Sequence, residues 1–257
     1  MGDAGRCDTL NDDRTAALAE TIPGTLVTLG DSVYSDGTTK EFADCYGPGW
    51  GRLLERTRPA PGNHEYHIAG AAGYFDYFGD RAGPAGRGWY SFDLGTWHLL
   101  SLDSECYAIG GCGPDSPQGR WIAEDLAARV VACTLAYWHR PVFSTGQHGD
   151  QRDVAPLWQA LQDAGADVVL SGHDHDYERF VRQDAAGRPD PGGMTEFVVG
   201  TGGAPLRAFL LPHDTSAFRD AGHYGVLVLT LRPGAFDWRF LSVPDGAPLD
   251  SGSEACH

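Results

Sequence analysis

Apolar and polar residues follow one another along this chain in a pattern that predicts alternating strands and helices. Short apolar runs ending at a glycine or a polar residue are typical of buried strands. We expect such strands at residues 25–29, 133–138 and 167–170, and a pair of strands over 89–98 that turn at Gly95 and continue to 103. Apolar residues near helical spacing predict helices at 8–20, 71–78, 120–129 and 154–164, with shorter helical pieces around Phe42 and at 50–55.

After Tyr177 the helical spacing stops and strand-like segments take over. We expect strands at 179–182, 196–199, 224–231 and 236–241, the last two joined by a turn at Pro233 and Gly234. No internal repeat, low-complexity tract or linker is visible in the sequence. Residues 1–257 are therefore expected to form a single α/β domain with a β-rich C-terminal half.

Length and charge narrow the classes of protein to which the chain can belong. Its 257 residues, 42% of them hydrophobic, can build a substantial core. Nineteen Lys and Arg against 35 Asp and Glu give a formal charge of -16, which repels polyanions. No nucleic-acid partner is therefore expected, and no membrane partner, because no stretch approaches the ~20 apolar residues of a membrane span.

Six cysteines indicate an oxidising environment. They form no CxxC pair and no zinc-ligand spacing, so a disulfide framework is favoured, although six reduced cysteines in a cytosolic enzyme remain an alternative. We expect a secreted or extracytoplasmic protein. The chain opens on Met1-Gly2-Asp3 without a basic and apolar leader, so we expect either that a leader has been removed or that this start is internal.

One cysteine pair can be favoured and another excluded. Cys106 and Cys112 share a loop and are the better candidates for a bond. Cys133 should not pair with Cys106, because the strands beside them are joined through a helix and must run parallel. The two cysteines then lie at opposite strand ends, ~20 Å apart, whereas a disulfide tolerates Cα separations only up to ~7 Å.

Polar side chains collect where the predicted strands end. The strand at 167–170 leads into Ser171-Gly172-His173-Asp174-His175, whose two histidines point the same way along an extended backbone. His-x-His alone is a weak metal signal, but Asp31, Asn63 and His139 also follow predicted strands or a proline-rich loop. Because ligands bind outside the carboxyl ends of strands in an open α/β sheet, these residues are expected to converge.

Five short motifs in this order carry a family resemblance: Gly2-Asp3-Ala4-Gly5, Gly30-Asp31-Ser32-Val33-Tyr34, Gly62-Asn63-His64-Glu65, the lone His139, and Gly172-His173-Asp174-His175. Together they resemble the calcineurin-like metallophosphoesterases, in the purple acid phosphatase branch. The resemblance implies a four-layer αββα sandwich of two mixed β-sheets, with helices outside and metals at one sheet edge.

The same resemblance implies a binuclear metal centre with seven ligands. They are Asp3, Tyr34 and His175 for the first metal, Asn63, His139 and His173 for the second, and Asp31 as the bridge. A tyrosine phenolate suits Fe(III), so the expected cofactors are Fe(III) and a divalent ion such as Zn, Fe or Mn. By default, Asp174, Asp176 and Glu178 are expected to be solvated or to support these ligands.

Two histidines are expected to act on the substrate. His64 would serve as general acid, and His148 stands where the branch often has a substrate-facing pair, of which Gly149 replaces the second member. His67, with the remaining histidines, is expected to be ordinary. The implied function is hydrolysis of a small phosphoester, with a monoester favoured. A phosphodiesterase on the same site and a catalytically silent metal-binding protein are the alternatives.

The start of the chain gives a further expectation. In the family, Asp3 follows a buried strand, but only Met1 and Gly2 precede it here, and a strand needs roughly five residues. We therefore expect the first strand of the fold to be missing and Asp3 to lie on a loosely held end.

Overall fold

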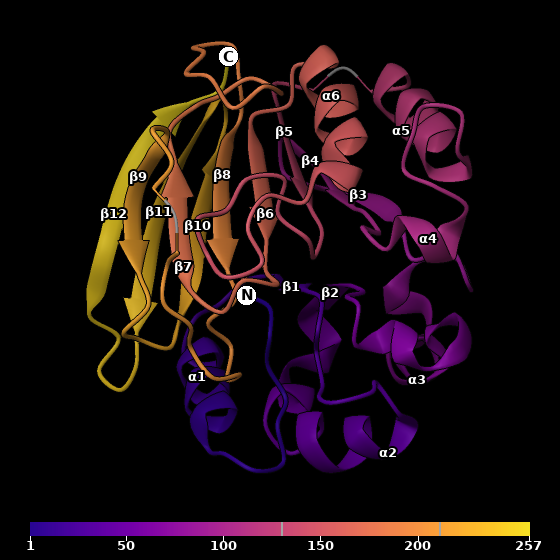
Figure 1. Cartoon of the computed structure of the whole chain (residues 1–257), viewed down its shortest axis with the longest axis vertical. Coiled ribbons are helices and arrows are strands. Elements are labelled where there is room, and N and C mark those ends of the chain that lie inside the picture. The colour runs from indigo at the N-terminus through magenta and orange to yellow at the C-terminus, as the bar shows by residue number, and fades with distance from the viewer. Residues whose placement is uncertain (130, 211) are drawn as a thin grey trace.

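The computed structural model describes residues 1–129, 131–210 and 212–257. Its centre is a seven-stranded mixed sheet in the order β3-β4-β5-β6-β8-β7-β9 (Figure 1). These strands span Tyr90–Leu94 (β3), Trp97–Ser101 (β4), Cys133–Tyr137 (β5), Val168–Ser171 (β6), Tyr177–Phe180 (β7), Thr195–Val199 (β8) and Ser216–Asp220 (β9). Strands β4, β5, β6 and β8 are parallel, and the strands toward both edges are antiparallel to their neighbours.

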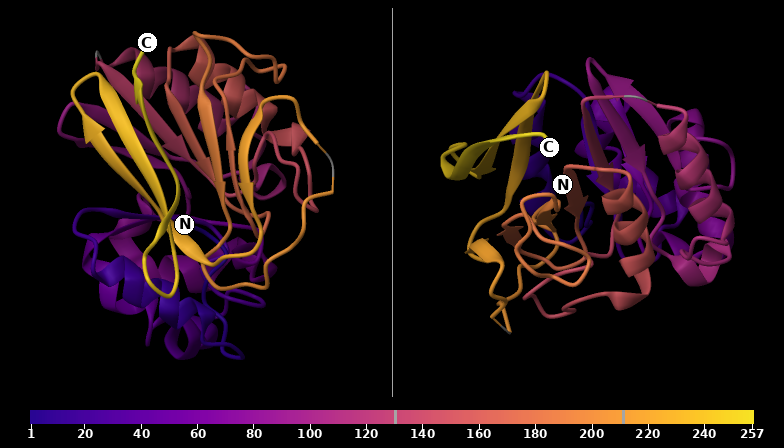
Figure 2. Two further views of the ribbon diagram at one scale, coloured as in Figure 1. Left: turned by 90° about the vertical axis from the view of Figure 1, so that its left-hand side faces the viewer. Right: turned by 90° about the horizontal axis from the view of Figure 1, so that it is seen from above.

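Helices cover one face of this sheet and further strands cover the other (Figure 2). Helices α5 (Pro117–Ala127) and α6 (Ala155–Asp163) pack on the first face. The second face meets the antiparallel sheet β10 (Gly225–Arg232), β11 (Ala235–Ser242) and β12 (Pro248–Ala255). A parallel pair, β1 (Leu26–Leu29) and β2 (Thr57–Ala60), lies among the N-terminal helices.

The remaining helices are short. They are α1 (Asn11–Glu20), α2 (Thr39–Glu41), α3 (Ala72–Phe78) and α4 (Cys106–Ile109), a π-helical turn at Phe42–Tyr46, and 3-10 segments at Trp50–Arg56, Glu65–His67, Ala69–Ala71, Gly79–Ala82 and Arg152–Val154. None of the helices among the described residues is long and apolar enough to cross a membrane.

Every residue of the central strands β4, β5, β6 and β8 is buried. In β5, Leu135 lies on the side of β10 and Tyr137 donates to the Arg58 carbonyl of β2 at 3.1 Å, while Ala136 between them belongs to the core formed with α5 and α6. Successive side chains of a strand point to opposite faces, so an uninterrupted apolar run fills two cores at once. The sequence pattern identified these strands for that reason, and the expected α/β class with a large mixed sheet is confirmed, although the second sheet is antiparallel and not mixed.

Three strands were not expected from the sequence, and all three lie at sheet edges: β2, β9 and β12. Pro59 made residues 57–60 look like a rigid loop, but β2 pairs only with β1, so the missing proline N–H costs no ladder bond. Other expected bounds shift by a few residues. Helix α5 begins at Pro117, ahead of Arg120, because Ser116 accepts a hydrogen bond from the Gly119 N–H as its N-cap.

The expectation that Asp3 lies on a loose end is wrong. The Asp3 N–H donates to the Gly30 carbonyl at 3.2 Å, and the Asp3 carbonyl accepts from Ala204 at 2.9 Å. Gly2 donates to Val199 of β8 at 2.8 Å, so the segment is hydrogen-bonded on both sides, and Asp3 is fully buried. Beside Met1, an apolar cavity of about 450 Å³ lies between β1, the central sheet and β10.

Three disulfides join all six cysteines: Cys7–Cys45, Cys106–Cys112 and Cys133–Cys256. The favoured pair is confirmed. The exclusion of a Cys106–Cys133 bond is confirmed as well, because β4 and β5 are parallel with Trp97 opposite Cys133. The Cys133–Cys256 bond ties the last residues of the chain to the beginning of β5 and closes a separation of 123 residues.

The sequence separations of 6 and 123 residues predict that two of the disulfides stabilise the folded protein by different amounts. Replacing both Cys133 and Cys256 by serine should lower the free energy of unfolding by about 5 kcal/mol, because a long loop regains its chain entropy. Replacing Cys106 and Cys112 should cost only about 2 kcal/mol, since six residues separate them. Urea unfolding without reductant measures both. Equal losses would contradict the assignment of the stabilisation to loop length.

Candidate metal centre

The expected site residues come together at the edge where the parallel strands end. Asp31 follows β1, Asn63 follows β2, and His139 follows β5. His173 and His175 leave the end of β6. Since β1 with β2 and β5 with β6 run parallel, their carboxyl ends deliver these side chains to a common place.

One group of donor atoms surrounds the Tyr34 hydroxyl. This hydroxyl donates to Asp3 Oδ1 at 2.8 Å and lies 3.3 Å from both Asp31 Oδ2 and His175 Nε2. His175 Nε2 is itself 3.3 Å from Asp3 Oδ1. All four side chains are buried. The three residues expected at the first metal therefore lie together, with Asp31 beside them.

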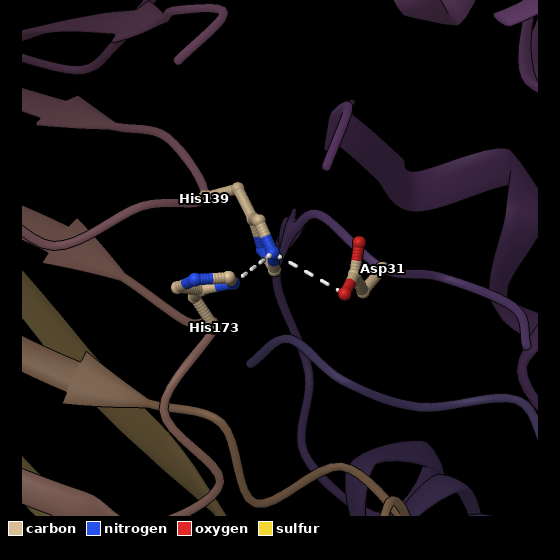
Figure 3. Close-up of side chains that lie close together, drawn as sticks. All are labelled: Asp31, His139 and His173. Atoms are coloured by element: carbon tan, nitrogen blue, oxygen red, sulfur yellow. Dashed lines mark hydrogen bonds and ion pairs between the residues drawn. The ribbon is translucent and has the colours of Figure 1, made fainter. Parts of the chain in front are cut away.

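A second group surrounds His139 Nε2 (Figure 3). This nitrogen lies 3.3 Å from Asp31 Oδ2, 3.1 Å from His173 Nδ1 and 3.0 Å from Asn63 Oδ1. The donor atoms of Asp31, His139 and His173 all lie within 4.8 Å of one another. His139 Nδ1 is directed to the Leu29 carbonyl at 2.8 Å, which fixes the ring and turns Nε2 toward the group. Asp31 Oδ2 is thus common to both groups.

The backbone at this site adopts conformations that non-glycine residues rarely take. Asp3, Asp31 and His173 have positive φ angles of 61°, 46° and 70°. Glycines allow the close approach of the segments: a Cβ on Gly62 would lie 2.4 Å from Asp31 Oδ1, and one on Gly172 would lie 2.7 Å from Asp3 Oδ2. Strained conformations of this kind persist only where the surroundings enforce them, as at functional sites.

Glu65 makes several of the contacts that hold this backbone in place. Its buried carboxylate accepts the backbone N–H groups of Asp31 at 3.0 Å, Ser32 at 2.7 Å and Gly62 at 2.7 Å. One side chain thereby holds the loop after β1 against the loop after β2. The sequence motif contained Glu65, but its position after two candidate functional residues gave no sign that it binds backbone rather than substrate.

The two groups concentrate buried negative charge, which a cation would stabilise. Asp3 and Asp31 are buried carboxylates beside one phenol. Burial and these two carboxylates hold the pKa of Tyr34 well above its ordinary value. Burial would lower the pKa of His139, but the charge of Asp31 prevails and raises it to about 10. Carboxylate, phenol, amide and imidazole donors around concentrated negative charge fit the two metal ions that the family resemblance implies.

His64 lies at the rim of the site. Its ring is 4.5 Å from the Tyr34 ring, and its Nε2 is 3.7 Å from Asp31 Oδ2. Its Nδ1 contacts the Ser35 carbonyl, which can only accept, so Nδ1 carries a proton and Nε2 faces the site. His67, expected to be ordinary, lies 4.7 Å from the His64 ring and shares the same carbonyl at 3.0 Å.

His148 is also brought to the site. Its ring stacks on the His173 ring at a centroid distance of 4.1 Å. Its backbone N–H donates to Asp174 Oδ1 at 2.8 Å, and Ser144 donates to the other oxygen of Asp174 at 2.5 Å. Asp174 therefore holds the loop that carries His148.

Of the two environments expected for the neighbouring carboxylates, solvation or support of the ligands, solvation is wrong for all three. Asp174, Asp176 and Glu178 are fully buried. Glu178 accepts from the Thr145 N–H and hydroxyl, both at 2.8 Å, and so supports the same loop as Asp174. Neither carboxylate oxygen of Asp176 has a hydrogen-bond partner among the described residues. A His-x-His motif with alternating acids looks exposed in sequence, yet Asp174 and Asp176 in the turn before β7 and Glu178 within β7 are all buried.

A comparison with known families identifies the class of protein. A model of the calcineurin-like phosphoesterases matches residues 4–177, which is more than half of the chain. The chain belongs to the calcineurin-like phosphoesterase family. The matched range contains all expected site residues except Asp3.

Purple acid phosphatases are among its relatives, as expected. Over 229 residues the chain is 26% identical to purple acid phosphatase 15 of Arabidopsis thaliana, covering 74% of this chain and 42% of that protein. Over 207 residues it is 27% identical to acid phosphatase type 7 of Homo sapiens, covering 66% and 46%. Purple acid phosphatase PPD1 from yellow lupin (Lupinus luteus) seeds shares the fold over 99% of this chain and 52% of that one, with a TM-score of 0.79 and 19% identity. The chain spans about half the length of these relatives.

The role of Glu65 can be tested by replacing its carboxyl group with an amide. Glu65→Gln should lower the free energy of unfolding by about 3 kcal/mol, because an amide cannot accept all three N–H groups in a buried place. Glu55→Gln is the control, since Glu55 is exposed and its one ion pair among the described residues is with Arg81 at the surface. Chemical unfolding of both variants measures the difference, and equal stabilities would refute the role given to Glu65.

Proposed function

We propose that this chain is a binuclear metal-dependent phosphoester hydrolase acting on small phosphomonoesters. The observation that carries the proposal is the convergence of seven donor side chains from separate segments into two groups that share Asp31 Oδ2. Asp3, Tyr34 and His175 would hold one metal, and Asn63, His139 and His173 the other. Membership of the calcineurin-like phosphoesterases supports the same reaction class.

The residues around the donor groups fit hydrolysis of a phosphoester. Two bound metal ions would neutralise the phosphate and acidify a water for in-line attack at phosphorus. His64 would give a proton to the leaving-group oxygen from Nε2, which lies on the side of Asp31 while Nδ1 donates to the Ser35 carbonyl. Glu65 and Asp174 keep the loops of Asp31 and His148 in position and so preserve this geometry.

Tyr34 favours Fe(III) as the ion in the first group. Its hydroxyl lies among Asp3, Asp31 and His175, and a phenolate there would add a third hard anionic oxygen. A divalent ion such as Zn, Fe or Mn suits the amide and imidazole donors of the second group. All six cysteines are paired, which supports a secreted or extracytoplasmic location.

The metal content of the purified protein and its activity on p-nitrophenyl phosphate test the proposal directly. We expect two ions per chain by elemental analysis. His173→Ala should retain one ion and lose activity by at least roughly 100-fold, because the second group is left with too few donors. His223→Ala is the matched control, since the His223 side chain is half exposed and, among the described residues, hydrogen-bonds to Asp220 alone. A wild type with fewer than two ions, or an unimpaired His173→Ala variant, would overturn the assignment.

The identity of the first ion has a spectroscopic test. If Tyr34 binds Fe(III), the oxidised protein should absorb visible light through phenolate-to-iron charge transfer, and Tyr34→Phe should remove this band. Tyr77→Phe should keep it, because Tyr77 packs among aromatic rings near Phe42 and Tyr46. A colourless and fully active wild type would refute the tyrosinate role.

A further inference from the structure

Residues 204–210 form a strap across the candidate metal centre. Ala204 donates to the Asp3 carbonyl at 2.9 Å, and Leu210 donates to the Thr145 carbonyl at 2.9 Å. Between these anchors, the Pro205 carbonyl accepts from His175 Nδ1 at 2.9 Å, while the Arg207 N–H donates to the His175 carbonyl at 3.0 Å. The backbone of Arg207 is thus held directly beside a candidate metal ligand.

The side chain of Arg207 reaches from this strap to the other half of the site. Its Nη1 lies 2.5 Å from His148 Nε2, and the His148 ring stacks on His173 at 4.1 Å. Since a guanidinium can only donate, His148 Nε2 is the acceptor and carries no proton in this arrangement. The backbone of Arg207 therefore contacts a candidate ligand of the first donor group, and its side chain contacts a histidine that stacks on a candidate ligand of the second group. The contact with His148 holds the guanidinium in position.

Two other arginines near the site, Arg6 and Arg140, are already paired with carboxylates. Arg6 donates to both carboxylate oxygens of Asp8, at 2.8 and 2.6 Å, and Arg140 donates to Glu105 at 2.7 and 3.1 Å. For Arg207, by contrast, no carboxylate of the described residues lies within 4.0 Å. The chain has a formal charge of -16, so acidic side chains are plentiful. Because none of them in the described part of the chain neutralises Arg207, its guanidinium can bind an anion from solution.

The loop that carries His148 has no side chain at the next position. Gly149 follows His148 and has no side chain, and nothing lies within 4 Å of the position that its Cβ would take. The position that a side chain of residue 149 would take is therefore free of atoms from the described residues. A guanidinium has five N–H groups in a planar fork that matches phosphate oxygens, and His148 engages one of its terminal nitrogens.

We propose that Arg207 binds the non-bridging oxygens of the substrate's phosphoryl group and selects dianionic monoesters over monoanionic diesters. This inference rests on the proposed function. The attraction grows with the charge of the phosphoryl group, and a diester replaces one charged oxygen by an uncharged ester oxygen. The strap holds Arg207 in place beforehand, so little ordering is needed when the phosphate arrives.

The test compares Arg207→Ala and Arg207→Lys with the wild type on p-nitrophenyl phosphate and bis(p-nitrophenyl) phosphate. Arg207→Ala should lower kcat/KM for the monoester by roughly 10- to 100-fold, the loss of one charge-assisted contact. The monoester-to-diester ratio should fall at least roughly tenfold, with Arg207→Lys between the two. Binding of inorganic phosphate, measured by calorimetry on each metal-loaded protein, should weaken in parallel.

Arg239→Ala is the matched control, because Arg239 is exposed on β11 and no carboxylate of the described residues lies within 4.0 Å of it. Equal losses on both esters, with unchanged phosphate binding and metal content, would assign Arg207 a merely structural role and overturn the inference alone. A wild type that hydrolyses neither ester would instead overturn the proposed function, and the inference with it.

Discussion

Two buried carboxylates that share one phenol are the constraint on which this structure depends. Asp3 and Asp31 both contact the Tyr34 hydroxyl, and both are almost fully shielded from water. Two like charges ~5 Å apart at an effective dielectric constant of ~20 repel each other by about 3 kcal/mol. The neighbouring histidines relieve part of this repulsion, which is why His139 attracts a proton. Metal cations would relieve it more completely, so the fold and the cofactor are energetically linked.

The same constraint explains how the backbone is arranged. Asp3, Asp31 and His173 have positive φ angles that direct their side chains toward the site. Hydrogen bonds from another segment hold each of these backbone conformations in place. Glu65 fixes the loop of Asp31, and the Asp3 carboxylate accepts the His173 N–H at 2.9 Å. A candidate ligand thus also helps to position the backbone of its neighbour. The donor groups are therefore largely arranged by protein contacts alone, which favours rapid capture of ions with the matching geometry.

Sequence reasoning succeeded where a local pattern has a single explanation. The apolar runs of β5 and β6 are buried along their whole length, and the short segments after them contain three of the seven expected donors, His139, His173 and His175. It failed at the edge strands β2, β9 and β12, because a strand with one neighbour needs no regular apolar alternation. It also failed for contacts between distant segments. The anchoring of Asp3 by residues of the 200–204 region, and the reach of Arg207 to His148, join positions that no local spacing connects.

The bond between Cys133 and Cys256 has a consequence for resistance to proteolysis. It makes residues 133–256 a closed covalent loop that contains His139, His173 and His175 and is tied at the strand end opposite to these ligands. The turn around Arg188 is exposed and is a natural place for a protease to cut. A single cut there opens the loop without releasing either fragment. The nicked protein would still carry its ligands on one covalently connected molecule and would separate into two pieces only after reduction.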